Sequence, residues 1–285
     1  MVNAPGSLRD DMRSQRSFLD ARSPAYARLA VTAKRAYLWR TLAERHLQTN
    51  EPARAVAWLW PARIATASKP ARPLELFDVG SSAGLNLNGD QLPPMWERQD
   101  GEQLDVALTV PMTRRIGFDL RPLDVLHEED ARWLKACVWP GEREREARLE
   151  LAIRAFRSLQ SAPDAPTVHL ARAGEVPSLL PHGDDGLLAL VCQTIVRDYL
   201  PQSEWETYRT GLQSWLLSRP PGSAMWVELE VNEQARQGGP PVALTVHVRG
   251  ARGLCSFGLA QCEPHPRRLD VDVAAVSALR AALDA

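Results

Sequence analysis

The sequence contains little cysteine, and none of it has metal-binding spacing. Its four cysteines, Cys137, Cys192, Cys255 and Cys262, form no C-x-x-C pair and lie in apolar segments. Such a pattern is typical of reduced, buried thiols. It disfavours a structural zinc site, and we identify no metal-binding motif elsewhere.

Long apolar runs and an excess of charge are also missing. Residues 1–20 carry charges throughout, so they provide neither the apolar core of a signal peptide nor a membrane span. We therefore expect a cytoplasmic protein that has no membrane partner. The 34 Lys and Arg residues against 35 Asp and Glu give a net charge of −1, so the bulk composition offers no reason to expect nucleic acid binding.

The chain has 285 residues and a hydrophobic content of 45%, which suit one sizeable α/β domain with a small appendage. Its most informative stretch is residues 74–87. Asp78 closes an apolar run, and Gly80 and Gly84 follow it. We interpret this as a buried strand that enters a tight turn, the place where α/β proteins bind nucleotide cofactors. Glycines at a strand end also occur for steric reasons alone, so a turn without a ligand is the alternative.

The turn resembles a known cofactor motif. Asp78, Gly80, Ser82 and Gly84 fall on alternate positions, as in the acidic-x-Gly-x-Gly-x-Gly motif of class I S-adenosylmethionine (SAM) dependent methyltransferases, with serine at the middle glycine. The dinucleotide form G-x-G-x-x-G does not fit this spacing. Residues 79–87 resemble the G-A-S-A-G-L-N-L signature of the DUF2332 family of bacterial proteins, and residues 117–125 resemble its G-x-D-L-x-P-x-D segment. The resemblance covers roughly residues 73–201.

This resemblance implies SAM as the cofactor. The cofactor-binding residues that it implies are Asp78, Gly80, Ser81, Ser82, Gly84, Asn86, Asp119, Gly174 and Glu175. Asp119 follows the second strand, where a carboxylate accepts hydrogen bonds from both ribose hydroxyls; a helix N-cap is an equally supported role. Gly174 stands where such proteins commonly have an adenine-binding aspartate, and Glu175 is beside it.

Gln193 and Thr194 are the catalytic candidates, because they are the first residues after the apolar run of the fourth predicted strand. Related sequences often have His-Ser at this point. Glutamine cannot take up a proton near neutral pH, so Gln193 is expected to position an acceptor and not to deprotonate it. Methyl transfer chiefly requires in-line positioning of the acceptor, so a missing base does not argue against it.

We expect an α/β fold with a Rossmann-like sheet of the class I methyltransferase type, mostly parallel and with about seven strands. Residues 232–241 are too short for a helix, which favours an antiparallel edge. Residues 1–70 are predicted to form an N-terminal helical cap, whose first helix begins at Ser23-Pro24. Residues 71–285 are predicted to form the SAM-binding domain, with a hairpin insertion near residues 95–110 that turns at Asp100-Gly101.

The resemblance implies a SAM-dependent methyltransferase, and the composition favours a small-molecule acceptor. The alternative is a non-catalytic Rossmann-like domain that binds a nucleoside-type ligand or a partner protein. Ser82, Gly174 and Gln193 support this alternative, because each departs from the methyltransferase pattern.

Overall fold

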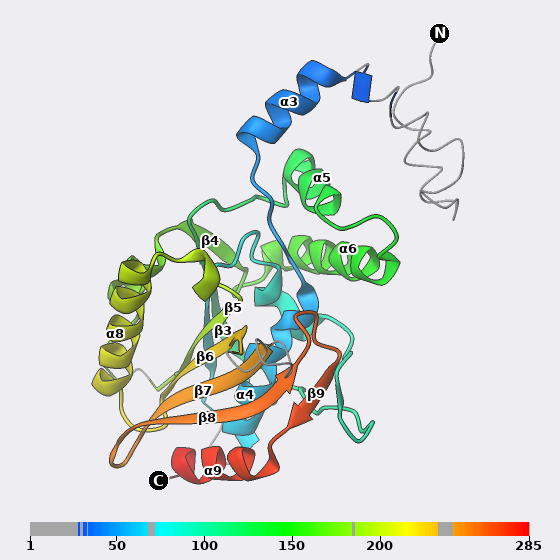
Figure 1. Cartoon of the computed structure of the whole chain (residues 1–285). Helices are drawn as coiled ribbons and strands as arrows, with labels where there is room; N and C mark the ends of the chain where they lie inside the picture. Colours follow the sequence, from blue (N-terminus) through cyan, green and yellow to red (C-terminus); the bar gives the residue numbers. More distant parts are fainter. Residues whose placement is uncertain are drawn as a thin grey trace.

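The computed structural model describes residues 28, 31–32, 34–67, 72–183, 186–232 and 242–284. Within them, nine strands form one sheet in the order β2-β9-β8-β7-β6-β5-β1-β3-β4 (Figure 1). The strands are β1 (Leu74–Val79), β2 (Glu97–Arg98), β3 (Met112–Asp119), β4 (Thr167–Leu170), β5 (Leu188–Thr194), β6 (Ala224–Val231), β7 (Val242–Gly250), β8 (Gly253–Cys262) and β9 (Arg268–Val271).

The helices are α3 (Arg35–Glu44), α4 (Val56–Ala67), α5 (Glu128–Ala136), α6 (Arg143–Ser158), α7 (Val176–Leu179), α8 (Gln202–Ser218) and α9 (Val273–Asp284). Short 3-10 helices lie between them: η1 (Pro52–Ala55), η2 (Leu85–Gln91), η3 (Leu159–Ser161), η4 (Ala173–Glu175) and η5 (Arg197–Tyr199). The glycine turn is followed only by η2, since Asn88-Gly89-Asp90 and the prolines beyond it disfavour a longer helix.

One half of the sheet is parallel. The pairs β4–β3, β3–β1, β1–β5 and β5–β6 all run in the same direction. Every residue of β1 and β5 is buried, as is typical of central parallel strands covered on both faces. The chain moves from β1 towards β3 on one side and from β5 towards β6 on the other, so the strand order reverses between β1 and β5.

The other half forms an antiparallel edge, as predicted. β6, β7 and β8 make a meander, and β9 pairs antiparallel with β8. The predicted number of about seven strands is too low, because β2 and β9 are also present. Both are short, and β2 exists only because Glu97 and Arg98 pair with β9 in parallel.

The helices cover the sheet in two layers (Figure 1). On one face α4 and α9 pack against side chains such as Leu74, Leu76 and Leu190. On the other face α8 packs against Phe77 and Val79, which alternate with the first set along β1. A third apolar cluster joins η2 to α5 and α6.

The predicted cap, residues 1–70, contains two different kinds of helix. α3 has no buried residue and lies away from the sheet (Figure 1). In contrast, α4 belongs to the main core, where the side chain of Trp58 is 1% exposed. Residues 52–67 therefore pack as part of the sheet domain. The predicted helix start at Ser23-Pro24 lies outside the described residues.

The predicted insertion near residues 95–110 contains the expected turn. Arg98 N donates to Glu102 O at 2.8 Å, and Gly101 has a φ of +86°. The second arm is reduced to a single bridge between Glu97 and Gln103. Beyond it the chain is irregular, because β2 pairs with β9 instead.

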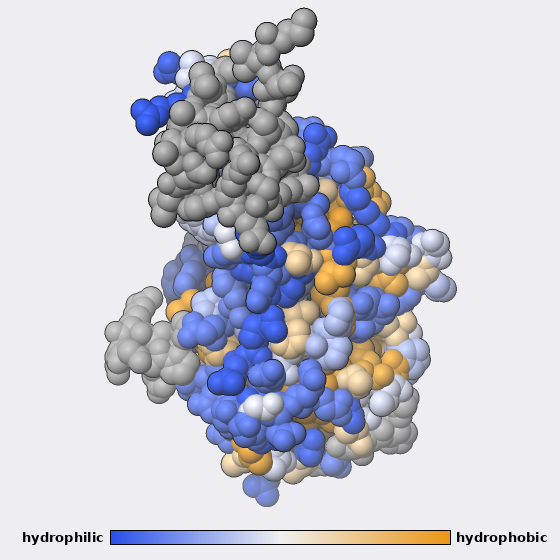
Figure 2. All heavy atoms as spheres, turned by 90° about the vertical axis from the view of Figure 1, so that its right-hand side faces the viewer, coloured by the Kyte–Doolittle hydropathy of each residue, from blue (hydrophilic) through white to orange (hydrophobic). Residues whose placement is uncertain are grey.

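Figure 2 shows one face of the molecule, on which both hydrophilic and apolar side chains lie. Apolar patches are separated by hydrophilic side chains across this face. Across the described residues, we find no helix with both the length and the apolarity needed to cross a membrane.

Candidate functional site

The turn after β1 has a left-handed backbone at three points. Gly80 and Gly84 have φ values of +73° and +72°, and Ser82 has a φ of 55°. Gly80 is exposed. A Cβ atom at Gly80 would lie 2.5 Å from Cγ2 of Val196, so both the conformation and the close approach require glycine. The turn is fixed to the neighbouring strand, because Gly80 N and Ser81 N donate to Phe118 O at 2.8 and 3.1 Å.

Ser82 stands at the middle glycine of the methyltransferase-like motif. Its left-handed conformation costs a non-glycine residue about 1 kcal/mol. Its hydroxyl accepts a hydrogen bond from Asn50 Nδ2 at 2.6 Å and donates one to Gln48 Oε1. Gln48 Nε2 also donates to Arg121 O at 2.7 Å. The segment before η1 is therefore attached to the turn, a role that the sequence analysis did not identify for Gln48 and Asn50.

Asp119 ends β3 beside this turn. Its Oδ2 accepts a hydrogen bond from Ser82 N at 2.7 Å, and its Oδ1 accepts one from Arg121 N at 2.8 Å. The side chain is half-buried. α5 begins only at Glu128, so Asp119 is not its N-cap. Each carboxylate oxygen retains a second lone pair for a ligand.

Asp78 and Ser81 have buried oxygen atoms without a hydrogen-bond partner. Asp78 is 2% exposed, and its Oδ2 has no partner among the described residues. Burial, followed by the charge of Asp119, raises the pKa of Asp78 to about 8. Ser81 Oγ is likewise unpartnered in the described structure, and it lies 2.4 Å from where a Cβ of Gly117 would be. The motif thus has buried polar atoms whose hydrogen bonds are not satisfied by the described residues.

The remaining cofactor candidates lie further along the same edge or deeper in the fold. Glu175 Oε2 accepts a hydrogen bond from Arg172 N at 2.9 Å and so caps η4. A Cβ at Gly174 would lie 3.5 Å from Cγ2 of Thr207, which places η4 against α8. The backbone carbonyl of Asn86 accepts from Trp58 Nε1 at 2.8 Å. Hydrogen bonds therefore unite the β1 turn with Asp119, but not with Gly174 or Glu175.

Gln193 and Thr194 end β5, as predicted, and both are buried. Gln193 is 0% exposed. Its Oε1 accepts from Trp226 Nε1 at 3.1 Å, and its Nε2 donates to Glu230 Oε1 at 2.8 Å. Both ends of the amide are thus bonded to the protein.

Glu230 is the residue at this edge that the sequence analysis missed. Its carboxylate accepts hydrogen bonds from Val196 N at 3.0 Å and Arg197 N at 3.3 Å, directly after the left-handed Ile195. Burial raises the pKa of Glu230 to about 7, although these hydrogen bonds lower it. Because Val196 packs against Gly80, Glu230 fixes the loop that faces the β1 turn. The available signal was an acidic residue in the apolar run of residues 225–231.

We call this set the carboxyl-edge site: residues 78–84, Asp119, residues 193–197 and Glu230. Its parallel core, glycine turn and strand-end carboxylate define a Rossmann-like α/β protein. The chain belongs to the DUF2332 family, described as an uncharacterized protein conserved in bacteria, whose model matches residues 11–271. This confirms the resemblance of the two sequence motifs. No curated protein matches the chain.

Three solved structures are distantly similar. The plantazolicin methyltransferase BpumL in complex with SAH is 11% identical with a TM-score of 0.35, and the match covers 82% of this chain and 66% of that chain. A SAM-dependent methyltransferase from Clostridium acetobutylicum is 8% identical with a TM-score of 0.34, over 88% of this chain and 86% of that one. The DhpI-SAM-HEP complex is 14% identical with a TM-score of 0.27, over 81% and 85%. The chain thus spans just under two thirds of the first of these proteins.

Proposed function

We propose that the chain is a SAM-dependent methyltransferase that acts on a small-molecule acceptor. The observation that carries the proposal is the exposed, left-handed Gly80 after β1, held beside Asp119 through the 2.7 Å bond to Ser82 N. Doubly wound sheets bind nucleotide ligands at the carboxyl ends of the strands where the strand order reverses, and Gly80 lies at this point.

The residues present fit SAM. Its ribose diol matches the free lone pairs of Asp119, and its positive charges match the carboxylate of Asp119. The unpartnered Oδ2 of Asp78 and Oγ of Ser81 are further polar atoms at the turn. When bound, SAM supplies a methyl group on a sulfonium centre. Asn86, Gly174 and Glu175 stay predictions as cofactor contacts.

On the acceptor side we assign Gln193 a positioning role. It bonds Trp226 and Glu230, and Glu230 holds the amides of Val196 and Arg197 in the loop after β5. Gln193 therefore fixes the conformation of the loop at residues 195–197, and its amide does not need to contact a substrate. Thr194 remains the catalytic candidate at the strand end, where it would orient an acceptor.

The alternative is a non-catalytic domain that binds a nucleoside-type ligand or a partner protein. The burial of Gln193 favours this alternative, because the amide that comes first off β5 is fully occupied by protein partners. Methyl transfer that depends mainly on positioning does not need a base at this position, so the enzyme remains our proposal.

Calorimetry with S-adenosylhomocysteine (SAH), SAM and NAD tests the proposal. We expect SAH and SAM to bind with micromolar-scale affinity, on the order of −8 kcal/mol, and NAD not to bind. No binding of SAH or SAM would overturn the proposal. Incubation of extract metabolites with methyl-labelled SAM then separates the enzyme from the binder, since only the enzyme transfers label to an acceptor.

A further inference from the structure

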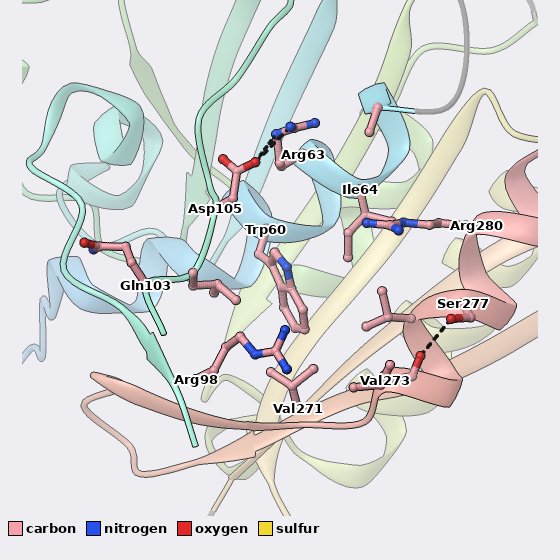
Figure 3. A pocket seen from close by; sticks show the side chains of 13 residues that line it. Trp60, Arg63, Ile64, Arg98, Gln103, Asp105, Val271, Val273, Ser277 and Arg280 are labelled. Carbon is pink, nitrogen blue, oxygen red and sulfur yellow. Dashed lines mark hydrogen bonds and ion pairs between the residues drawn. The ribbon is translucent and has the colours of Figure 1, made fainter. Parts of the chain in front are cut away.

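A cavity of about 340 Å³ lies between α4, α9 and the chain around β2 (Figure 3). Its lining is mixed: Trp60 and Ile64 of α4, Val271 at the end of β9 and Val276 of α9 form an apolar part of the wall, and polar side chains form the rest. In Figure 3 the indole of Trp60 stands at the centre. A cavity of this size with a flat aromatic wall suits a small planar organic ligand.

The charged side chains around the cavity are mainly basic. Arg63 is neutralised by Asp105, whose Oδ2 lies 2.9 Å from Nε and 2.8 Å from Nη2 of Arg63. Arg98 is paired with Asp100, which lies outside the lining, and Arg280 has no ion pair among the described residues. The two arginines approach Trp60 and Ile64 from different sides (Figure 3). Asp105 is the acidic residue in the lining, and it is already paired, so the cavity carries net positive charge.

Three donor side chains line this cavity: Arg98, Arg280 and Trp60. Arg98 Nη2 lies 3.1 Å from Asp100 Oδ2, but its Nε is buried without a partner in the described structure. For Arg280, the described chain provides neither a hydrogen bond nor an ion pair. The indole N–H groups of Trp58 and Trp96 donate to backbone carbonyls, whereas Trp60 Nε1 has no acceptor among the described residues. Among these donors the Nε of Arg98 is buried without an acceptor, which indicates a missing acceptor, whereas Arg280 is exposed and can also bond water.

The cavity is separate from the carboxyl-edge site, with which it shares no lining residue. Trp58, in the first half of α4, bonds Asn86 near the glycine turn. Arg63, Ile64 and Ala67, in the second half, line the cavity. A ligand here is therefore not the methyl acceptor, which must reach the carboxyl edge.

We propose that this cavity, which we call the arginine cavity, binds an organic anion with a flat apolar body and one oxyanion group. The body packs on the indole of Trp60, and the indole N–H donates to the ligand. The guanidinium groups of Arg280 and Arg98 bind the oxyanion, since their planar donor forks match carboxylate and phosphate.

The probes are indole-3-acetate, its neutral isostere indole-3-acetamide, and phenyl phosphate, titrated by calorimetry or ligand-observed NMR into the full chain with SAH present. We expect at least one anion to bind about tenfold to a hundredfold more tightly than the amide. A preference for indole-3-acetate or for phenyl phosphate identifies the oxyanion as carboxylate or phosphate. Arg280→Met and Arg98→Met keep the apolar stems and should each weaken binding of that anion. Arg252→Met, in the exposed β7–β8 turn, is the matched control and should not.

If neither indole-3-acetate nor phenyl phosphate binds more tightly than indole-3-acetamide, or if no probe binds, the proposal is overturned. So would full anion affinity in the Arg98→Met/Arg280→Met double variant. Titrations repeated without SAH should give the same probe affinity, and a lower affinity with SAH present would contradict the separation of the two sites. Failure of the chain to bind SAH would overturn only the proposed methyltransferase function, since the arginine cavity does not depend on it.

Discussion

The carboxyl-edge site and the arginine cavity differ in the sign of their polar groups and in the part of the chain that supplies them. At the carboxyl edge, glycines allow close approach to the backbone, and the titratable side chains are the acids Asp78, Asp119 and Glu230. In the arginine cavity, apolar and polar side chains form the wall, and the guanidinium of Arg280 has no ion pair among the described residues. If both proposals hold, one chain has two sites that select ligands of opposite charge.

The largest expected effect tests the acidity of the carboxyl edge. The pKa of Asp78 is raised to about 8 from 3.8, so the folded state holds this proton more tightly than the unfolded state. The stability that this provides is fully present below about pH 4 and is lost as the pH rises through about 8. Asp78→Asn stays neutral at every pH. The wild type should therefore lose on the order of 5 kcal/mol relative to Asp78→Asn between pH 4 and 9.

Urea unfolding at several pH values measures this difference. Glu230 also has a raised pKa, but its contribution is common to both proteins and cancels. Asp124→Asn, at an exposed carboxylate, serves as the control. Parallel stability curves for wild type and Asp78→Asn would show that Asp78 is not a buried neutral acid.

Gly80→Val should separate the two sites most directly. The new side chain would meet Val196 and would be held at a φ of +73°, so SAH binding should weaken by at least about a hundredfold. Binding of the organic anion in the arginine cavity should persist. Calorimetry with both ligands measures this, with circular dichroism to verify the fold.

Gly101→Val is the matched control for Gly80→Val. Gly101 has a φ of +86°, and its Cβ would meet no atom within 4 Å, so it carries similar backbone strain without a crowded site. It should lose stability and keep SAH affinity. Normal SAH binding by Gly80→Val would show that the turn is purely structural.

Asp119→Ala probes the ribose contact that we propose. Loss of a charge-assisted pair of hydrogen bonds should cost roughly 1.5 to 3 kcal/mol, which is about a tenfold to hundredfold loss of SAH affinity. Asp124→Ala is the control, because Asp124 Oδ1 accepts from Leu126 N two residues on, as Asp119 does from Arg121 N. A lower melting temperature with unchanged SAH affinity would limit Asp119 to holding the turn.

The smallest expected effect concerns Ser82. Ser82→Gly and Ser82→Ala both remove the hydroxyl that bonds Asn50 and Gln48, but only glycine relieves the left-handed strain. Ser82→Ala should therefore be about 1 kcal/mol less stable than Ser82→Gly. Thermal unfolding of the two variants tests this, and equal stability would mean that the backbone at residue 82 relaxes in Ser82→Ala.

Local patterns were sufficient to predict most of the sheet. β1 lies in the predicted buried strand before the glycine turn, and β5 ends at Gln193 and Thr194 as predicted, since each apolar run is visible within a few residues. β2 and β9 were not predictable in this way, because Glu97 and Arg98 become a strand only beside residues distant in the sequence. Propensity contains no information on such pairing.

The candidate site shows the same limit. The glycine turn and Asp119 were predicted as neighbours from motif order, and the bond from Ser82 N joins them. Glu230 was missed, because its contact with Val196 N depends on the register between β5 and β6. Gln48 and Asn50 precede the domain in sequence, and only tertiary packing brings them to Ser82.

The β6–β7–β8 meander has a consequence for the order of folding. Gly250 pairs with Gly253 directly across a turn, so these strands can associate with little loss of chain entropy. In the parallel half, Asp78 pairs with Cys192, and the two are separated in sequence by more than a third of the chain. Contacts close in sequence form faster than distant ones. The acidic site therefore lies in the part of the sheet that we expect to assemble late, against an edge that is already in place.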